Sequence, residues 1–395
     1  MAILATGADL VVPSPGVPER HVSIRSALEA GVAVRSEVDL AAERIRVPLV
    51  AITGTNGKTT VTELTARMLS ASGLVVAAAG NIGRPLIEVE GAGIDPRGDE
   101  PDLDVVVAEV SSFQLALTDV FRPRVAVLLA VAEDHTDWHG SFDAYVAAKA
   151  RIFANQTGGD LLVYDADDPV ATGMAAAAPA LRTGCSLVPG PEYHLEGDAL
   201  CARDDVLART ADLRRALPHD IGNSLAAAAA ARHVGASPEG VLRALRGFET
   251  LPHRVTLVGE SGGVRWYDDS KATNPHAALA ATRSFERVVL LAGGRNKGLD
   301  LGALAQASDH VVSVVAFGEA AGEVEAAFAG IRPVTRIATM HEAVLAAAQA
   351  ASAGDVVLLS PGCASFDAYD DYAERGDDFS AEVLSLIGSD RSRTP

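Results

Sequence analysis

The chain has 395 residues, a formal charge of −19 and 48% hydrophobic residues. This length predicts two or three domains, and the composition is typical of a globular protein with buried cores, which excludes a disordered chain. The acidic excess argues against a protein that coats nucleic acid, because phosphate-driven binding needs clustered Lys and Arg. Any anionic ligand must therefore be held by a local arrangement of donors.

Three cysteines, Cys185, Cys201 and Cys363, are widely spaced and form no Cys-x-x-Cys pair. This spacing predicts neither a disulfide framework nor a zinc site, and it is typical of a reducing compartment. The first residues lack the basic and apolar regions of a signal peptide, and no apolar run is long enough to span a membrane. We therefore expect a cytoplasmic protein that binds neither nucleic acid nor membrane.

Short Val, Leu and Ile runs alternate with Ala-rich helical stretches along the chain. The expected strands, in chain order, are residues 9–12, 49–53, 103–110, 125–131, 160–163, 287–292, 310–317 and 355–360. Most are continuously apolar, which is typical of parallel strands covered by helices on both faces. The pattern predicts an α/β chain with largely parallel sheets.

Two stretches predict domain boundaries. Residues 41–48 lead from a first small segment into a buried strand, and residues 247–254 precede a new series of strands and helices. We therefore expect three segments, 1–46, 47–250 and 251–395. Residues 185–215 are short and polar, which favours a small β-rich excursion.

Residues 49–60 predict a phosphate-binding loop. An apolar strand runs into a Gly-rich loop, and a helix begins near Lys58. Glycines allow backbone N–H groups to converge on phosphate oxygens, and the helix N-terminus adds its positive dipole end. Lys58 is expected to reach the β- and γ-phosphates, and the Thr59 hydroxyl to reach Mg²⁺. The loop departs from the standard pattern, since Ile52 replaces its first Gly. The expected ATP-binding residues are Gly54, Thr55, Asn56, Gly57, Lys58, Thr59 and Thr60.

Acidic and basic side chains follow the next strands. Glu109 ends an apolar strand, where an ionised carboxylate is costly unless it is paired or bound to metal. Mg²⁺ and a structural ion pair are equal alternatives there. Residues 133–139, which follow the expected strand over 125–131, contain two His and three acidic residues. This concentration of ligand side chains beyond the end of a strand favours metal or substrate binding. Lys149 lies between alanines on an expected helix over 142–153, and by itself it has the pattern of a solvated lysine.

Taken together, these motifs resemble the Mur ligase family, ATP-dependent enzymes that form amide bonds in peptidoglycan precursors. The resemblance covers nearly the whole chain, and its marks are residues 54–59, 80–83, 109–115, 133–135, 149, 251–254, 268–274, 297 and 360–367. It implies a Rossmann-like N-terminal domain that binds a UDP substrate, a central P-loop ATPase domain and a Rossmann-like C-terminal domain that binds an amino acid.

The N-terminal domain is expected to be partial. Residues 8–18 resemble the later part of that domain in the family, so roughly 50–60 residues, about one βαβ unit and a little more, are missing from the pattern. Within the remnant, Ser14 and Gly16 match positions that contact the UDP substrate. We expect this segment to be the least stable part of the chain, with weakened affinity for the UDP substrate.

The resemblance also implies a ligand set for the reaction centre. Thr59 and Glu109 would hold one Mg²⁺, and His135 and Lys149 the second, with Lys149 carbamylated to a carboxylate-like ligand. The implied catalytic residues are Lys58, Lys149, His135 and Lys271. Further ATP contacts are implied at Asn223 and Asp269, for the adenine and the ribose, and at Arg254, for the phosphates. The family has Asn where this chain has Asp220, which puts one adenine contact in doubt because a carboxylate cannot donate.

The amino-acid pocket carries over to the C-terminal segment. The implied substrate contacts are Asn81 for the UDP substrate and Thr273, Lys297, Ser365 and Tyr372 for the amino acid. Tyr372 stands where the family pattern has Phe. The run over 111–115, the run over 269–274 and the Cys-Ala-Ser element before Arg375 resemble members that add D-glutamate to UDP-N-acetylmuramoyl-L-alanine.

The implied reaction begins when the L-alanyl carboxylate attacks the γ-phosphate of ATP. The acyl phosphate that forms is then attacked by the amine of D-glutamate, which releases phosphate. One alternative is a ligase of the same family that uses another amino acid, such as L-glutamate, or that extends folylpolyglutamate. Another is a truncated nucleotide-binding protein without full activity. We expect a monomer.

Overall fold

The computed structural model describes residues 7–89, 103–203 and 205–391. By their internal contacts, these residues form two compact units. The central unit comprises the chain up to Ala132 and Trp138–Glu249, and the C-terminal unit comprises Glu133–Asp137 and the chain from Thr250 onward. The limit between Glu249 and Thr250 lies one residue before the predicted boundary between residues 250 and 251. The predicted segment 1–46 is grouped with the central unit. The three-domain division stays a prediction.

Within the described residues, a nine-stranded sheet forms the middle of the central unit, in the order β11-β10-β9-β8-β7-β6-β3-β5-β4. The strands from β4 to β9 run parallel, and β10 and β11 continue the sheet as antiparallel strands. These strands are β3 (Leu49–Thr53), β4 (Val76–Gly80), β5 (Val105–Glu109), β6 (Val125–Leu128), β7 (Leu161–Asp165), β8 (Leu181–Ser186), β9 (Tyr193–Glu196), β10 (Ala199–Ala202) and β11 (Asp205–Arg209).

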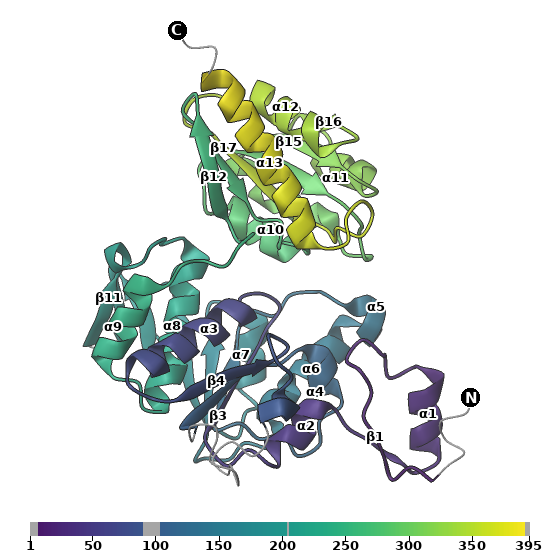
Figure 1. Cartoon of the computed structure of the whole chain (residues 1–395), viewed down its shortest axis with the longest axis vertical. Coiled ribbons are helices and arrows are strands. Elements are labelled where there is room, and N and C mark those ends of the chain that lie inside the picture. The colour runs from purple at the N-terminus through teal and green to yellow at the C-terminus, as the bar shows by residue number, and fades with distance from the viewer. Residues whose placement is uncertain (1–6, 90–102, 204, 392–395) are drawn as a thin grey trace. The chain divides into compact units, whose positions relative to one another are not determined.

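Both faces of the sheet are buried at β3, β5 and β6, as the apolar strands predict. Along β3, Val50 and Ile52 point into one core while Leu49 and Ala51 point into the other, because successive side chains alternate across a strand. Helices cover the two faces, and α3, α8 and α9 pack together on one of them (Figure 1). The described helices here are α3 (Lys58–Ala71), η2 (Leu86–Val89), α4 (Ser112–Ala116), α5 (Thr136–His139), α6 (Phe142–Ala154), α7 (Pro169–Ala175), η3 (Thr210–Asp212), α8 (Pro218–His233) and α9 (Pro238–Gly247).

The first described elements form a small annex to the central unit. A two-stranded parallel sheet pairs β1 (Leu10–Val11) with β2 (Ala33–Val34), alongside α1 (Val22–Glu29) and α2 (Glu37–Ala42). Asp39 on α2 is fully buried and accepts hydrogen bonds from Arg35 and from the backbone N–H groups of Asp119 and Val120. These bonds attach the annex to the loop before β6, while the two-residue strands add little buried area.

A second parallel sheet forms the C-terminal unit, in the order β12-β13-β17-β14-β15-β16, with only β12 antiparallel to its neighbour. Trp266 on β13 and Phe379 on α13 lie in its core. Its strands are β12 (Thr256–Ser261), β13 (Val264–Asp268), β14 (Val288–Gly293), β15 (Val311–Phe317), β16 (Val334–Arg336) and β17 (Val356–Gly362). Its helices are α10 (Pro275–Thr282), η4 (Leu301–His310), α11 (Ala321–Phe328), α12 (Met340–Ala350) and α13 (Tyr372–Arg391).

The predicted fold class is confirmed, since both large sheets are mostly parallel and interleaved with helices. Each expected strand is present, although the run predicted at 125–131 ends as a strand at Leu128. The β-rich excursion predicted over 185–215 corresponds to β9, β10 and β11. No helix among the described residues is long and apolar enough to cross a bilayer.

Candidate active site

The loop between β3 and α3 has the backbone that its glycines predict. Gly57 has a φ of +83°, and a Cβ there would lie 2.6 Å from the Asn223 side chain of α8. A Cβ on Gly54 would lie 2.6 Å from the Cβ of Leu129. Both positions therefore need glycine. The close approach also shows that Asn223, an expected adenine contact, lies against the phosphate loop.

Two lysines converge on this loop. Lys58 Nζ donates to the carbonyl oxygens of Gly54 at 3.0 Å and Thr55 at 2.9 Å, and Lys149 Nζ donates to the same Gly54 oxygen at 2.7 Å. Lys149 also lies 4.5 Å from the centre of the Tyr145 ring. The loop thus gathers two cations at one carbonyl, beside the helix N-terminus that is expected to receive phosphate.

The interpretation of Lys149 as a solvated helix lysine is wrong, because its exposed fraction is 1%. The inward face of α6 carries Tyr145, Ala148, Lys149 and Ile152. Lys149 is four residues after Tyr145 and three before Ile152, as neighbours on one side of a helix are. The apolar residues around Lys149 were therefore a signal that it faces inward. Thr55 Oγ1 contacts the Tyr145 hydroxyl at 3.0 Å, so this face of α6 also positions the loop.

Glu109 ends β5 with one oxygen bonded and one without a partner. Its exposed fraction is 3%, and Oε1 accepts a hydrogen bond from Asn81 Nδ2 at 2.9 Å. Oε2 is buried and has no hydrogen-bond partner among the described residues. A buried carboxylate oxygen without a partner is costly, and a hard cation such as Mg²⁺ fits this need. The structure also brings Asn81, an expected substrate contact, beside this expected metal ligand.

Asp220 forms a bidentate ion pair on α8. Arg215 donates to both of its carboxylate oxygens at 2.7 Å. The substitution of the family's Asn is therefore matched by a cation from within the central unit. With Asp at position 220, Asn223 is the residue that provides a side-chain amide at the start of α8.

Residues 133–139, which were expected to bind metal or substrate together, are divided between the two units. His139 stacks with Phe113 and contacts Ser112 through Nε2 at 3.0 Å, which gives it a packing role in the central unit. His135 and Asp134 belong instead to the C-terminal unit, and His135 has a strained φ of +53°. The second expected metal pair, His135 and Lys149, is thus divided between the two units and stays a prediction.

Three loops of the C-terminal unit begin at the carboxyl ends of the adjacent strands β13, β17 and β14. Lys271 and Thr273 follow β13, Ser365 follows β17, and Lys297 follows β14. Arg295 and Ala364 exchange backbone hydrogen bonds of 2.8 and 3.1 Å, which join two of these loops. Ligand sites of parallel sheets lie at this edge. The topology thus brings together residues that are up to 94 positions apart (365 − 271) in the sequence.

Tyr372 at the start of α13 completes this group of loops. Lys271 Nζ donates to the Tyr372 hydroxyl at 2.9 Å and lies 4.8 Å from the centre of its ring. The family's Phe would keep the ring contact and lose the hydrogen bond. All four expected amino-acid contacts and Lys271 therefore lie in one part of the C-terminal unit.

Asp269 is buried beside Ser360, whose hydroxyl donates to it at 2.7 Å. Burial is the main cause that raises the pKa of this carboxyl to about 7, while Ser360 and the charge of Arg254 act in the opposite direction. The expected ribose contact Asp269 and the expected phosphate contact Arg254 are therefore neighbours in the C-terminal unit.

Arg375 is the residue whose role the motifs did not reveal. It is fully buried, and its guanidinium donates to the Ser270 hydroxyl and carbonyl at 2.9 and 2.8 Å and to the carbonyls of Cys363 and Ala364 at 3.1 and 3.3 Å. Burial lowers the pKa of Arg375 to about 10. One side chain thus ties the loop after β13 to the loop after β17. The available signal was its place in the sequence Arg-Gly-Asp over residues 375–377, which follows the Cys-Ala-Ser element.

The remaining expected contacts are less defined. Ser14 and Gly16 are exposed in the annex, and no described atom lies within 4 Å of a Cβ built on Gly16. The roles of these residues, and of Asn56, Thr59 and Thr60, stay predictions.

The lysines are more informative, because the sequence contains only four, at positions 58, 149, 271 and 297. All four are expected site residues, whereas surface cations are supplied by Arg.

Two models of known protein families match long segments of this chain. Residues 52–186 match the Mur ligase middle domain, and residues 253–363 match the glutamate ligase domain of Mur ligases. The UDP-N-acetylmuramoylalanine--D-glutamate ligase of Syntrophus aciditrophicus is 41% identical over 96% of this chain and 84% of its own length. The enzyme of that name from Frankia casuarinae is 43% identical over 96% of this chain and 81% of its length.

Solved structures agree in fold. MurF ligase from Thermotoga maritima in complex with ADP has a TM-score of 0.65 at 16% identity, over 97% of this chain and 98% of that chain. FolC of E. coli in complex with DHPP and ADP has a TM-score of 0.59 at 22% identity, over 96% of this chain and 100% of that chain. The chain belongs to the Mur ligase family. Within that family, the relatives described above are D-glutamate ligases.

Proposed function

We propose that this chain is an ATP-dependent ligase that adds D-glutamate to UDP-N-acetylmuramoyl-L-alanine in peptidoglycan precursor synthesis. The observation that carries the proposal is the set of neighbouring loops in the C-terminal unit that hold Lys271, Lys297 and Ser365. Two ammonium groups and a hydroxyl suit a dicarboxylic amino acid, because each can donate to a carboxylate. The names of relatives 41–43% identical over 96% of the chain support the same activity.

ATP would bind at the loop of the central unit. Lys58 and Lys149 both donate to the neutral Gly54 carbonyl, and a phosphate oxygen is a stronger acceptor for an ammonium group. Lys58 would therefore turn toward the phosphates and offset the repulsion between them and the attacking carboxylate. Asn223 would contact adenine from α8, and Arg254 and Asp269 would complete ATP binding from the C-terminal unit.

Glu109 supports the use of Mg²⁺, since its buried Oε2 lacks a partner in the described chain. Thr59 and Glu109 would hold one ion, and His135 and carbamylated Lys149 a second. Bound Mg²⁺ would neutralise phosphate charge during transfer. Asn81 would hold Glu109 in place through its 2.9 Å hydrogen bond while contacting the UDP substrate. The acyl phosphate must be kept from water until the amine attacks, which requires the site to close.

Phosphate release tests the proposal directly. The full chain is incubated with ATP, Mg²⁺ and UDP-N-acetylmuramoyl-L-alanine, together with D-glutamate, L-glutamate or meso-diaminopimelate in parallel. We expect release with D-glutamate only. Release with L-glutamate alone would reassign the amino acid within the family. Absence of release with all three, at high concentrations of the UDP substrate, would exclude a ligase of this specificity and favour a nucleotide-binding protein.

Carbamylation of Lys149 has a readout that does not depend on activity. With only four lysines in the chain, ¹³C NMR of protein equilibrated with ¹³C-bicarbonate resolves any lysine carbamate with little overlap. We expect one carbamate signal, lost in Lys149→Arg and kept in the matched control Lys297→Arg. A signal that persists in Lys149→Arg contradicts the modification at this residue. Rescue of a Lys149→Ala variant by added short carboxylates is the corresponding kinetic test.

Cytoplasmic location and a monomeric state stay predictions.

A further inference from the structure

The hairpin of β9 and β10 carries a cluster of side chains that the ligase reaction does not use. In the order of the central sheet, β9 lies four strands from β3, which precedes the phosphate loop. At about 4.8 Å between neighbouring strands, this separation is about 19 Å. Any ligand of the hairpin is therefore distinct from ATP and its metal ions.

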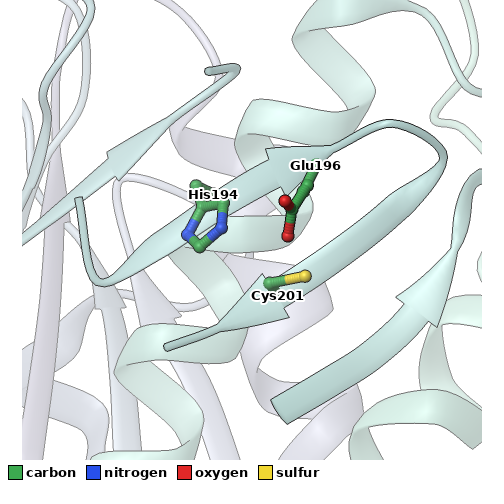
Figure 2. A group of neighbouring side chains, drawn as sticks. All are labelled: His194, Glu196 and Cys201. Atoms are coloured by element: carbon green, nitrogen blue, oxygen red, sulfur yellow. The ribbon is translucent and has the colours of Figure 1, made fainter. Parts of the chain in front are cut away.

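Three potential metal ligands share one face of this hairpin. His194 and Glu196 are two residues apart on β9, and Cys201 of β10 pairs directly with His194. Their ligand atoms lie within 4.8 Å of one another, and Figure 2 shows the three side chains grouped over the two strands. Tyr193 and Leu200 point to the opposite face, into the core with α8. The alternation of both strands thus presents a nitrogen, an oxygen and a sulfur together.

The histidine is held in the form that binds metal. Its Nδ1 lies 3.0 Å from the Pro191 carbonyl oxygen, and a carbonyl can only accept, so Nδ1 carries the proton. The lone pair of the neutral ring is therefore on Nε2. A backbone carbonyl that accepts from the second ring nitrogen is the usual support of a metal-binding histidine, because it fixes the tautomer and the ring orientation.

The other two ligands are also without competing partners. Glu196 is exposed and its carboxylate makes no hydrogen bond or ion pair with the described chain, so this group can turn toward the cluster. Cys201 has an exposed fraction of 4%, and its sulfur makes only a 3.7 Å contact with the Ala199 carbonyl of the same hairpin. Imidazole, thiolate and carboxylate are the ligands that Zn²⁺ takes, in a tetrahedron whose fourth position holds water.

We propose that His194, Glu196 and Cys201 bind one Zn²⁺ ion, which clips β9 to β10 in the central sheet. The sequence offered no Cys-x-x-Cys spacing because the ligands come from two strands and meet only through their pairing. With three protein ligands and an exposed carboxylate, the site is built for reversible binding, and its effect is on stability.

Cobalt substitution tests the site on the full chain with excess Mg²⁺, which occupies hard-ligand sites. Co²⁺ bound here would give a sulfur-to-cobalt charge-transfer band and the intense d–d bands of tetrahedral coordination, and one equivalent of Zn²⁺ would remove them. We expect Cys201→Ser to abolish the charge-transfer band and His194→Gln to weaken Zn²⁺ binding at least tenfold in a chelator competition. Glu109→Gln should leave both readouts unchanged.

The matched control is Cys185→Ser, because Cys185 lies on the neighbouring strand β8 but faces the apolar core. It should keep the band and the stoichiometry of one. Zn²⁺ should also raise the melting temperature of the wild type and of Cys185→Ser, but not of His194→Gln. The proposal is overturned if the wild type gives no charge-transfer band, or if the band survives in Cys201→Ser. Should Cys201→Ser fail to fold, unchanged Zn²⁺ affinity in folded His194→Gln would equally overturn it.

Discussion

The phosphate loop of the central unit and the amino-acid loops of the C-terminal unit are built in opposite ways. The phosphate loop is a single segment, and the close approaches at Gly54 and Gly57 determine its shape. The amino-acid loops come from three strands and are joined by a backbone bridge and by the buried guanidinium of Arg375. A loop made of one continuous segment thus depends on glycines, which can adopt backbone conformations that other residues avoid. A site assembled from distant segments depends instead on a side chain that holds those segments together.

The phosphate loop should show the largest effect of a single change. Lys58→Ala removes an ammonium group that donates to the Gly54 carbonyl, and with it the positive charge that would stabilise the transition state. We expect a decrease in kcat on the order of 10³-fold. The measurement is D-glutamate-dependent phosphate release, with the melting temperature as a control because the loop should still fold. A decrease below tenfold would mean that Lys58 does not act on the transferred phosphate.

Arg375→Lys tests whether the C-terminal loops depend on their clamp. A lysine cannot reach all the acceptors, and each buried carbonyl left unsatisfied costs about 1–3 kcal/mol. We expect a loss of about 3 kcal/mol in the free energy of unfolding and a rise in the KM for D-glutamate of more than tenfold. The KM for ATP should change less, since the phosphate loop is in the other unit. Equal changes in both KM values would mean a general loss of structure and would contradict the positioning role.

Asp269 adds a pH dependence to the C-terminal unit. Because burial raises the pKa of its carboxyl from 3.8 to about 7, the folded state binds this proton more tightly than the unfolded state does. The free energy of unfolding should therefore decrease as the pH rises from about 4 to 7, by on the order of 3 kcal/mol. Urea unfolding across this range measures it, with Asp269→Asn as the comparison. If the free energy of unfolding changes with pH in the same way in Asp269→Asn, the Asp269 carboxyl is not the cause of that change.

Tyr372→Phe should have the smallest effect, because it removes one hydroxyl and leaves the ring beside Lys271. The loss of the 2.9 Å hydrogen bond is worth about 0.5–1 kcal/mol. We expect a two- to fivefold change in kcat/KM for D-glutamate, in keeping with the Phe of the family pattern. A change beyond fiftyfold would give the hydroxyl a direct role in the reaction.

Much of the fold could be predicted from the sequence because its signals are local. Continuous apolar runs indicate parallel strands buried on both faces, and the glycines over residues 54–57 indicate the phosphate loop. The interpretation of Lys149 failed for a related reason. Its immediate neighbours are alanines, and only its position relative to Tyr145 and Ile152 on the same helix face shows that it is buried.

The sequence by itself determined the α/β class, the phosphate loop and the chemical types of the site residues, because spacing and composition act over a few residues. Tertiary structure alone decided what those residues contact. The pairing of β14 with β17 brings Lys297 and Ser365 to one sheet edge, and the pairing of β9 with β10 sets Cys201 beside His194. The register of strand pairing depends on the summed burial of whole faces, so no local pattern records it.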